Sequence, residues 1–263
     1  MNKLAEKINI ILLCIGTVTL IGLQIKFLGW FLLLLGFITL LFCRRQFSKD
    51  VLLIYISIGI LGITQINTDI SYSHMLQMGV ELAAAVGIPY FVSRFIYKDY
   101  LVRFKFHHGR GWYKLEIAYI GLAILASYFL FPFYLKSTGA YLNWTVEPGA
   151  SNIIRFFIGT NALGIWDELF FVSTVLGILR KYLNFHFANL AQAVLFTSFL
   201  YELGFTGWGP LIIYPFALSQ GYIFKKTESL FYIITIHLSI DLILFLSLIN
   251  AHHPNWISIF VIR

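Results

Sequence analysis

The chain has 263 residues, of which 59% are hydrophobic, 18% aromatic and only 12% charged. A soluble domain carries about twice that share of charged residues, so the composition excludes a soluble enzyme or binding module. We expect an all-α fold, a polytopic transmembrane helical bundle of about eight or nine spans. The formal net charge of +7 does not indicate a nucleic-acid partner, because the basic residues form short clusters between apolar runs, as in cytoplasmic loops.

Nine apolar segments could cross a bilayer, which takes about 20 mostly apolar residues. The first follows Lys3 and Lys7 as a signal peptide would, but it lacks a clear small-residue cleavage site and another span follows at once, so we expect it to be retained. The two cysteines lie within apolar segments, where packing is the expected role. In chain order the segments cover residues 8–25, 27–43, 51–67, 75–97, 115–135, 152–179, 185–203, 210–224 and 229–250.

Clusters of basic residues occur in every second connection between these segments. They precede the first segment and follow the second, fourth, sixth and eighth, so all of them fall on one side if the nine spans are real. The positive-inside rule makes that side cytoplasmic. We expect a multi-pass membrane protein with a cytoplasmic N-terminus and a C-terminus on the far side. The clusters are Lys3 and Lys7; Arg44, Arg45 and Lys49; Arg94, Lys98, Arg103, Lys105, Arg110 and Lys114; Arg180 and Lys181; Lys225 and Lys226.

The polar residues inside the spans are concentrated in the carboxyl-terminal part. We expect residues 1–114 to form a scaffold of transmembrane helices with a basic cytoplasmic loop. Residues 115–250 would form the core and residues 251–263 a tail. The basic and aromatic stretch 98–114 suits an anionic leaflet, either as a loop or as an interfacial helix.

Two adjacent carboxylates, Asp167 and Glu168, lie inside the sixth segment. Ionisable groups at membrane depth cost a few kcal/mol each and usually face a bundle interior or a wet cavity. We interpret the pair as the centre of a buried polar site, although it could instead border a broken helix. Asn161 and Gly164 precede Glu168 by seven and four residues, so the three share one helix face.

Two other segments carry ionisable residues that could complete this site. His237 and Asp241 in the ninth segment are spaced i, i+4 and are neighbours on one face. They could also be an ion pair that only fixes helix packing. At about 1.5 Å per residue, both pairs lie within about one helical turn in depth. Glu202, in the seventh segment, lies roughly 7 Å higher and could simply face water.

The order and spacing of these residues resemble the CPBP family, the CAAX-protease and bacteriocin-processing intramembrane endopeptidases. The family pattern is E-E-x-x-x-R, then F-x-x-x-H, then H-x-x-x-N or H-x-x-x-D, on successive core helices. Asp167-Glu168-Leu-Phe-Phe-Val172 stands at the first motif, Phe196-Thr-Ser-Phe-Leu200 at the second and His237-Leu-Ser-Ile-Asp241 at the third. The resemblance covers residues 165–245, and only the third motif is intact.

By this resemblance, the first carboxylate and the second-motif His activate a water. Those positions hold Asp167 and Leu200 here. The third motif, His237 with Asp241, would stabilise the oxyanion. Leu200 cannot act as a base.

The first motif also departs from the pattern, because Val172 stands where an Arg would partner the second carboxylate. An active enzyme would need Glu168 or Glu202 as the missing proton acceptor. Two close carboxylates in a low-dielectric site share a proton, which places a general base beside a general acid. His237 could then donate to the developing oxyanion.

The leading hypothesis is a hydrolase, an intramembrane endopeptidase that cuts a membrane-associated peptide or a lipidated protein near the bilayer. The lost Arg and His motivate an alternative, a catalytically degenerate relative that binds a hydrophobic peptide or membrane partner. A third possibility is a proton-linked transporter, because carboxylate and His chains in spans also form proton relays. We expect no cofactor. A Zn or Mn ion on Asp167, Glu168, Glu202, His237 and Asp241 is a minor alternative that no short HExxH spacing supports.

Overall fold

The computed structural model describes residues 3–64, 66–106, 109 and 111–261. These residues form helices joined by loops, with no strand among them. The expected all-α fold is therefore confirmed. Arg110, one of the residues in the basic cluster after the fourth segment, lies outside the described residues.

Each of the nine apolar segments is helical. Several α-helices continue directly into π or 3₁₀ turns, as the bounds show. They are α1 (Lys3–Thr17) with η1 (Val18–Gly22), α2 (Lys26–Thr39) with η2 (Leu40–Phe42), α3 (Arg45–Ile63), α4 (Tyr72–Phe91) with η3 (Val92–Tyr97), α5 (Lys114–Thr138), η4 (Ala140–Asn143), α6 (Ala150–Asp167) with η5 (Glu168–Leu176) and α7 (Gly177–Leu179), α8 (Phe185–Glu202), α9 (Pro210–Thr227) and α10 (Leu230–His252).

Six helical stretches of the described chain are long and apolar enough to cross a membrane, which is what a multi-pass membrane protein requires. The stretch Lys26–Phe42 is apolar but shorter, and α8 and α9 do not meet the same criterion. The expected span number of eight or nine is therefore approximate. The six are Lys3–Gly22, Arg45–Ile63, Tyr72–Tyr97, Lys114–Thr138, Ala150–Leu179 and Leu230–His252.

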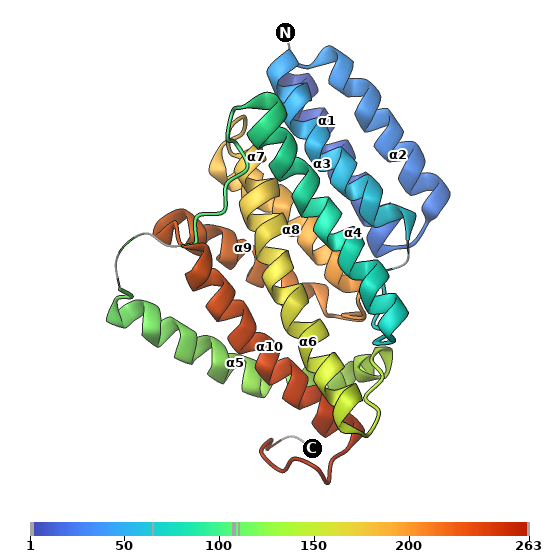
Figure 1. The fold of residues 1–263 in the computed structure, drawn as a ribbon, viewed down its shortest axis with the longest axis vertical. Coiled ribbons are helices and arrows are strands. Elements are labelled where there is room, and N and C mark those ends of the chain that lie inside the picture. Colours follow the sequence, from blue (N-terminus) through green and yellow to red (C-terminus); the bar gives the residue numbers. More distant parts are fainter. Residues whose placement is uncertain (1–2, 65, 107–108, 110, 262–263) are drawn as a thin grey trace.

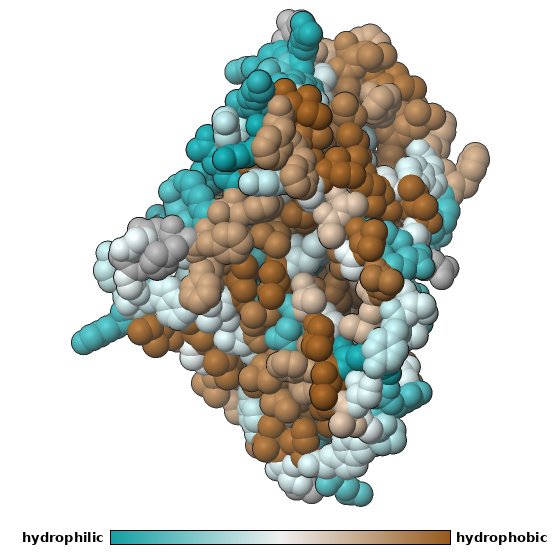
Figure 2. Space-filling view, in the orientation of Figure 1, coloured by the Kyte–Doolittle hydropathy of each residue, from teal (hydrophilic) through white to brown (hydrophobic). Residues whose placement is uncertain are grey.

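The helices lie side by side as a bundle whose centre is formed by α6, α8, α9 and α10 (Figure 1). The first three helices pack at one end of the bundle, and α5 runs along α10. Large apolar side chains are exposed on the outer helices, such as Leu76 of α4 at 71% and Leu115 of α5 at 81%. Figure 2 shows the resulting hydrophobic surface across the middle of the molecule, with hydrophilic residues gathered at its upper left edge. This surface is what a lipid-facing exterior requires.

The loops that carry the basic clusters are joined at one end of the bundle. Lys181, after α7, places its Nζ 2.6 Å from Asp50 Oδ2 of α3. Lys105, between η3 and α5, places its Nζ 2.9 Å from Glu228 Oε2 at the end of α9. The described residues of the 98–113 stretch are not helical, so an interfacial helix is not formed there. We call this end of the molecule the basic end.

The remaining loops meet at the opposite end. Thr68, between α3 and α4, donates its hydroxyl to the carbonyl of Asn143 over 2.6 Å. The amide of Asn143 donates in turn to the carbonyl of Gly204, between α8 and α9, over 2.7 Å. His253, after α10, lies with its Nε2 2.8 Å from the carbonyl of Val146. The alternation predicted from the basic residues is therefore present in the structure as two separate sets of loops.

Candidate active site between α6 and α10

Asp167 and Glu168 lie where the sixth span changes its winding. Asp167 is the last residue of α6, and Glu168 begins the nine-residue π-helix η5. Segments of π-helix are rare and often occur at functional sites. Both carboxylates are buried, with 1% and 0% of their surface exposed. The helix continues through the pair, so the pair does not mark a broken helix.

His237 of α10 meets both carboxylates of the pair. Its Nδ1 lies 2.7 Å from Glu168 Oε1. Its Nε2 lies 3.9 Å from Asp167 Oδ2 and 3.7 Å from Asp241 Oδ1. The structure therefore brings together the four residues expected to share one site. One ring nitrogen is held by a carboxylate, and the other faces two more at distances too long for direct hydrogen bonds.

Gly164 is what lets α10 come this close to α6. A Cβ at this position would lie 2.1 Å from Asp241 Oδ2 and 3.2 Å from His237 Cδ2. A larger residue there would have to displace the Asp241 carboxylate. Asn161, expected on the same face, turns away from the cluster, because its Nδ2 donates to the carbonyl of Phe157 one turn back over 2.8 Å.

Gln220 of α9 adds a third helix to the site, and the sequence analysis did not identify this residue. Its Nε2 donates to Glu168 Oε1 over 2.8 Å and to the carbonyl of Ile233 over 3.1 Å, and its side chain is completely buried. Glu168 Oε1 is thus held between this amide and His237. An amide in the middle of an apolar segment was the available signal, since buried polar groups in spans need partners.

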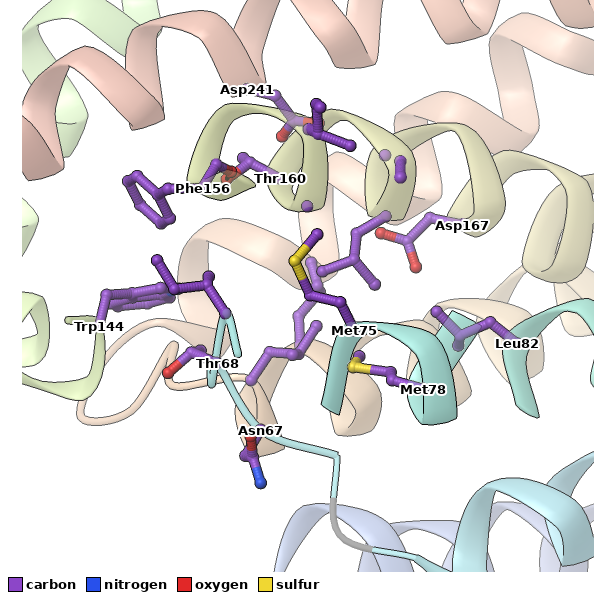
Figure 3. Close-up of a pocket in the computed structure, with 18 of the residues that line it drawn as sticks. Asn67, Thr68, Met75, Met78, Leu82, Trp144, Phe156, Thr160, Asp167 and Asp241 are labelled. Atoms are coloured by element: carbon purple, nitrogen blue, oxygen red, sulfur yellow. Dashed lines mark hydrogen bonds between the residues drawn. The ribbon is translucent and has the colours of Figure 1, made fainter. Parts of the chain in front are cut away.

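A cavity of about 170 Å³ opens from this cluster. Asp167, His237 and Asp241 line its polar end, and the rest of the wall is mostly apolar. Figure 3 shows Asp167 of α6 facing Met78 and Leu82 of α4 across this space. Further wall residues include Ile70, Met75, Trp144, Phe156, Leu163, Leu203, Phe205 and Leu244.

Several carboxylate oxygens of the cluster have no hydrogen-bond partner among the described protein groups. They are Asp167 Oδ1, Glu168 Oε2 and Asp241 Oδ2. A buried acceptor left unpaired costs about 1–3 kcal/mol. A cluster that carries three such atoms beside a cavity has the character of a binding site rather than of a purely structural ion pair.

Two positions of the family pattern are apolar in this chain, and the structure shows where they lie. Leu200 of α8 lines the same cavity as Asp167 and His237. Val172 is completely buried in η5. The second motif therefore reaches the site, but it brings a side chain that can neither accept a proton nor bind a polar group.

Glu202 does not join the cluster. Its Oε1 accepts the backbone N–H of Ile66 over 3.1 Å, in the loop between α3 and α4. It does not line the cavity, although Leu200 and Leu203 on either side of it do. The sequence analysis had placed Glu202 roughly 7 Å from the other four residues in membrane depth, which already indicated this separation. The expectation that Glu202 replaces the missing second-motif base finds no support in these contacts.

The described residues also offer no arrangement for a metal ion. Among them, no group of three or more His, Cys, Asp or Glu side chains is placed to hold one. The metal alternative therefore stays a prediction from the sequence.

Comparison with known proteins gives one match. Residues 149–243 match the family model described as Type II CAAX prenyl endopeptidase Rce1-like. This range runs from the start of α6 into α10 and contains every residue of the cluster. No curated protein and no solved structure matches the chain. The part of the chain that carries the site is therefore Rce1-like, and the CPBP resemblance inferred from its three motifs is confirmed.

Proposed function

We propose that this protein is an intramembrane endopeptidase in which Asp167 and His237 hold and activate the attacking water. The family match supports a CAAX protease-like endopeptidase at the level of the family. The observation that carries the finer assignment is the separation of 3.9 Å between Asp167 Oδ2 and His237 Nε2. A polar contact of this length is suited to a bridging water, and both groups line the cavity.

Asp167 is the general base in this proposal. Its Oδ2 lies 3.9 Å from His237 Nε2, too far for a direct hydrogen bond, so this oxygen is available to accept the proton of the bridging water. Glu168 also has one oxygen without a partner, but it does not line the cavity, and its Oε1 is held by Gln220 and His237. The water oxygen then attacks the carbonyl carbon of the peptide bond, and the proton passes from Asp167 to the leaving amine.

His237 serves the developing oxyanion. The Glu168 carboxylate accepts the Nδ1–H of the ring, which fixes the orientation of the imidazole and directs Nε2 toward the cavity. In its protonated form, His237 donates its Nε2–H to the oxyanion. Asp241, 3.7 Å from the same nitrogen, stabilises the positive ring. Glu168 and Gln220 thus act as positioning residues.

One observation favours a second candidate function, a relative that binds a peptide without cutting it. Leu200 occupies the cavity wall at the position of the second-motif His. If Asp167 alone cannot activate the water, the cavity becomes a binding site for an apolar segment. The two candidates differ in whether a precursor accumulates when the cluster is disabled.

The experiment compares cells that carry the wild-type protein, Glu168→Gln or His237→Ala, with membrane proteomics to detect uncleaved precursors. Asn161→Ala is the matched control, because Asn161 lies on the same helix but hydrogen-bonds within it. Thermal unfolding of each purified variant separates lost chemistry from lost folding. The endopeptidase requires the same precursors to accumulate in both cluster variants and not in the control. Identical profiles in all four strains would favour the binder.

A further inference from the structure

The cavity extends from the catalytic cluster in one direction only. The residues of α6 that line it, from Phe156 to Asp167, all precede Glu168. From α4 it takes residues between Met75 and Leu82, in the first half of that helix. It ends against residues 67–70 of the loop between α3 and α4. The cavity therefore joins the cluster to the end of the bundle opposite the basic end.

The other side of the cluster is filled with side chains. Val172, Val175, Leu176 and Leu179 follow the acidic pair along η5 and α7, and none of them has any exposed surface. A separate cavity at the basic end reaches Ser173 and Gly177 but touches none of the cluster residues. The close-packed apolar side chains in between leave no gap for a peptide. These residues lead toward Lys181, which belongs to the basic end.

The wall of the cavity is loosely packed between α4 and α6. An added Cβ at Gly79 of α4 would meet nothing within 4 Å, and one at Gly159 of α6 would meet only Met75 Cε, at 4.0 Å. Ala162 of α6 lines the same stretch and is exposed. Figure 3 shows Met75 lying between the two helices. Methionine is flexible and adapts to varied apolar partners, so this seam suits the entry of an extended segment.

The loop at the end of the cavity is polar and carries one carboxylate, that of Asp69. Asp69 accepts the backbone N–H of Ser71 over 2.8 Å and the Ser71 hydroxyl over 2.9 Å. These bonds lower the pKa of Asp69, so the group remains ionised near neutral pH. Asn67, also exposed, lies beside it in the wall. The cavity thus has a polar opening at residues 67–70 and a mostly apolar wall. This arrangement suits a polypeptide that leaves the membrane at the end of the bundle opposite the basic end.

We propose, resting on the endopeptidase function inferred above, that the site takes its substrate from the non-cytoplasmic face of the membrane. The positive-inside rule assigns the basic end to the cytoplasm, and the cavity reaches the other end. The substrate is then the outer juxtamembrane segment of a membrane-inserted or exported polypeptide, entering between α4 and α6. A cytoplasmic tail does not reach the cluster.

The first test is site-directed labelling with a membrane-impermeant maleimide. Single cysteines replace Asn67 at the mouth, Ala162 in the seam and exposed Lys226 at the basic end, in a chain whose Cys14 and Cys43 are changed to Ser. We expect Asn67→Cys and Ala162→Cys to be labelled on intact cells, and Lys226→Cys only after permeabilisation. Labelling of Lys226→Cys on intact cells, with Asn67→Cys protected until permeabilisation, would overturn the proposal. This readout does not depend on activity.

The second test locates the cleaved bonds. Precursors that accumulate with Asp167→Asn are mapped by treating intact cells with an external protease, which removes only segments outside the cytoplasm. In the Asp167→Asn variant these bonds stay uncut in the precursor. We expect the external protease to remove the segments that contain them. Survival of these segments would place the uncut bonds in the cytoplasm. That result would overturn the proposed entry from the non-cytoplasmic face, but not the endopeptidase function. Absence of any accumulated precursor, with the labelling pattern as expected, would overturn the endopeptidase and the substrate assignment, but not the direction in which the cavity opens.

Discussion

Two regions of this protein bury carboxylates, and they differ in how those carboxylates are satisfied. At the basic end, Asp50 is completely buried, and its oxygens meet Lys181 Nζ at 2.6 Å and Gln46 Nε2 at 3.1 Å. Glu6, also buried, is held by both Arg44 Nε and Nη2. Each oxygen has a cationic or amide donor.

In the candidate active site, Glu168 Oε1 has an amide donor, Gln220, but the other acidic groups are less well satisfied. Asp167, Glu168 and Asp241 share a single His, and each leaves one oxygen without a partner among the described protein groups. Burial alone therefore does not identify a functional carboxylate in this chain. Unsatisfied acceptors beside a cavity distinguish the site from an ion pair that stabilises the fold.

The largest effect that this comparison predicts is on activity. Asp167→Asn removes the proposed base at nearly constant volume, and loss of a general base typically lowers the rate by about 10²–10⁴-fold. Folding should be retained, because Asp167 makes no direct hydrogen bond to another described group that the amide would break. Precursor cleavage and thermal unfolding, measured on the same preparation, check this. A variant that still cleaves at the wild-type rate would remove Asp167 from the mechanism.

Gly164→Ala should damage both the site and the packing. The new methyl group would lie 2.1 Å from Asp241 Oδ2, and overpacking of this kind costs about 1–3 kcal/mol of the free energy of unfolding. Gly177→Ala in α7 is the matched control, because its Cβ would meet nothing within 4 Å. We expect a lower midpoint of thermal unfolding and reduced cleavage only for Gly164→Ala. Equal midpoints for the two variants would contradict the close approach of α10 to α6.

Lys181→Ala tests the basic end. It leaves buried Asp50 without its cation, although Gln46 and Tyr182 still donate to the carboxylate. A hydrogen bond to a charged group is worth about 1.5–3 kcal/mol, reduced here because Lys181 is itself about one-third exposed. We expect a lower unfolding midpoint with the cleavage rate per folded molecule unchanged. A change in that rate would mean that the two regions are coupled, and their separation would no longer hold.

The smallest effect is expected from Glu202→Gln. The amide can still accept the Ile66 N–H through its oxygen, and the residue lies outside the cavity wall. Cleavage should stay within about twofold of the wild-type rate, since substitutions away from the reacting groups usually change free energies by about 0.5 kcal/mol or less. A large loss of cleavage at unchanged stability would restore Glu202 as the missing proton acceptor.

Much of the site could be predicted because its signals are local. Adjacent acidic residues within an apolar run are rare, and the i, i+4 spacing of His237 and Asp241 places both on one face of whatever helix forms there. Gln220 was missed for the opposite reason. A single amide in an apolar segment has no local partner, and its role depends on the contact of its helix with η5. Asn161 shared the expected face, but it hydrogen-bonds within its own turn.

Hydropathy, basic clusters and motif spacing determined the membrane class, the nine helical segments, the four-residue cluster and the resemblance of residues 149–243 to Rce1-like endopeptidases, since each follows from residue patterns along the chain. Tertiary structure decided that Glu202 stays with Ile66, that Gln220 supports Glu168 and that the cavity opens toward one end only. These outcomes depend on the rotation of each helix about its own axis and on the shift that π-turns give to its side chains. The rotation and the shift are both set by packing between helices that are far apart in the chain.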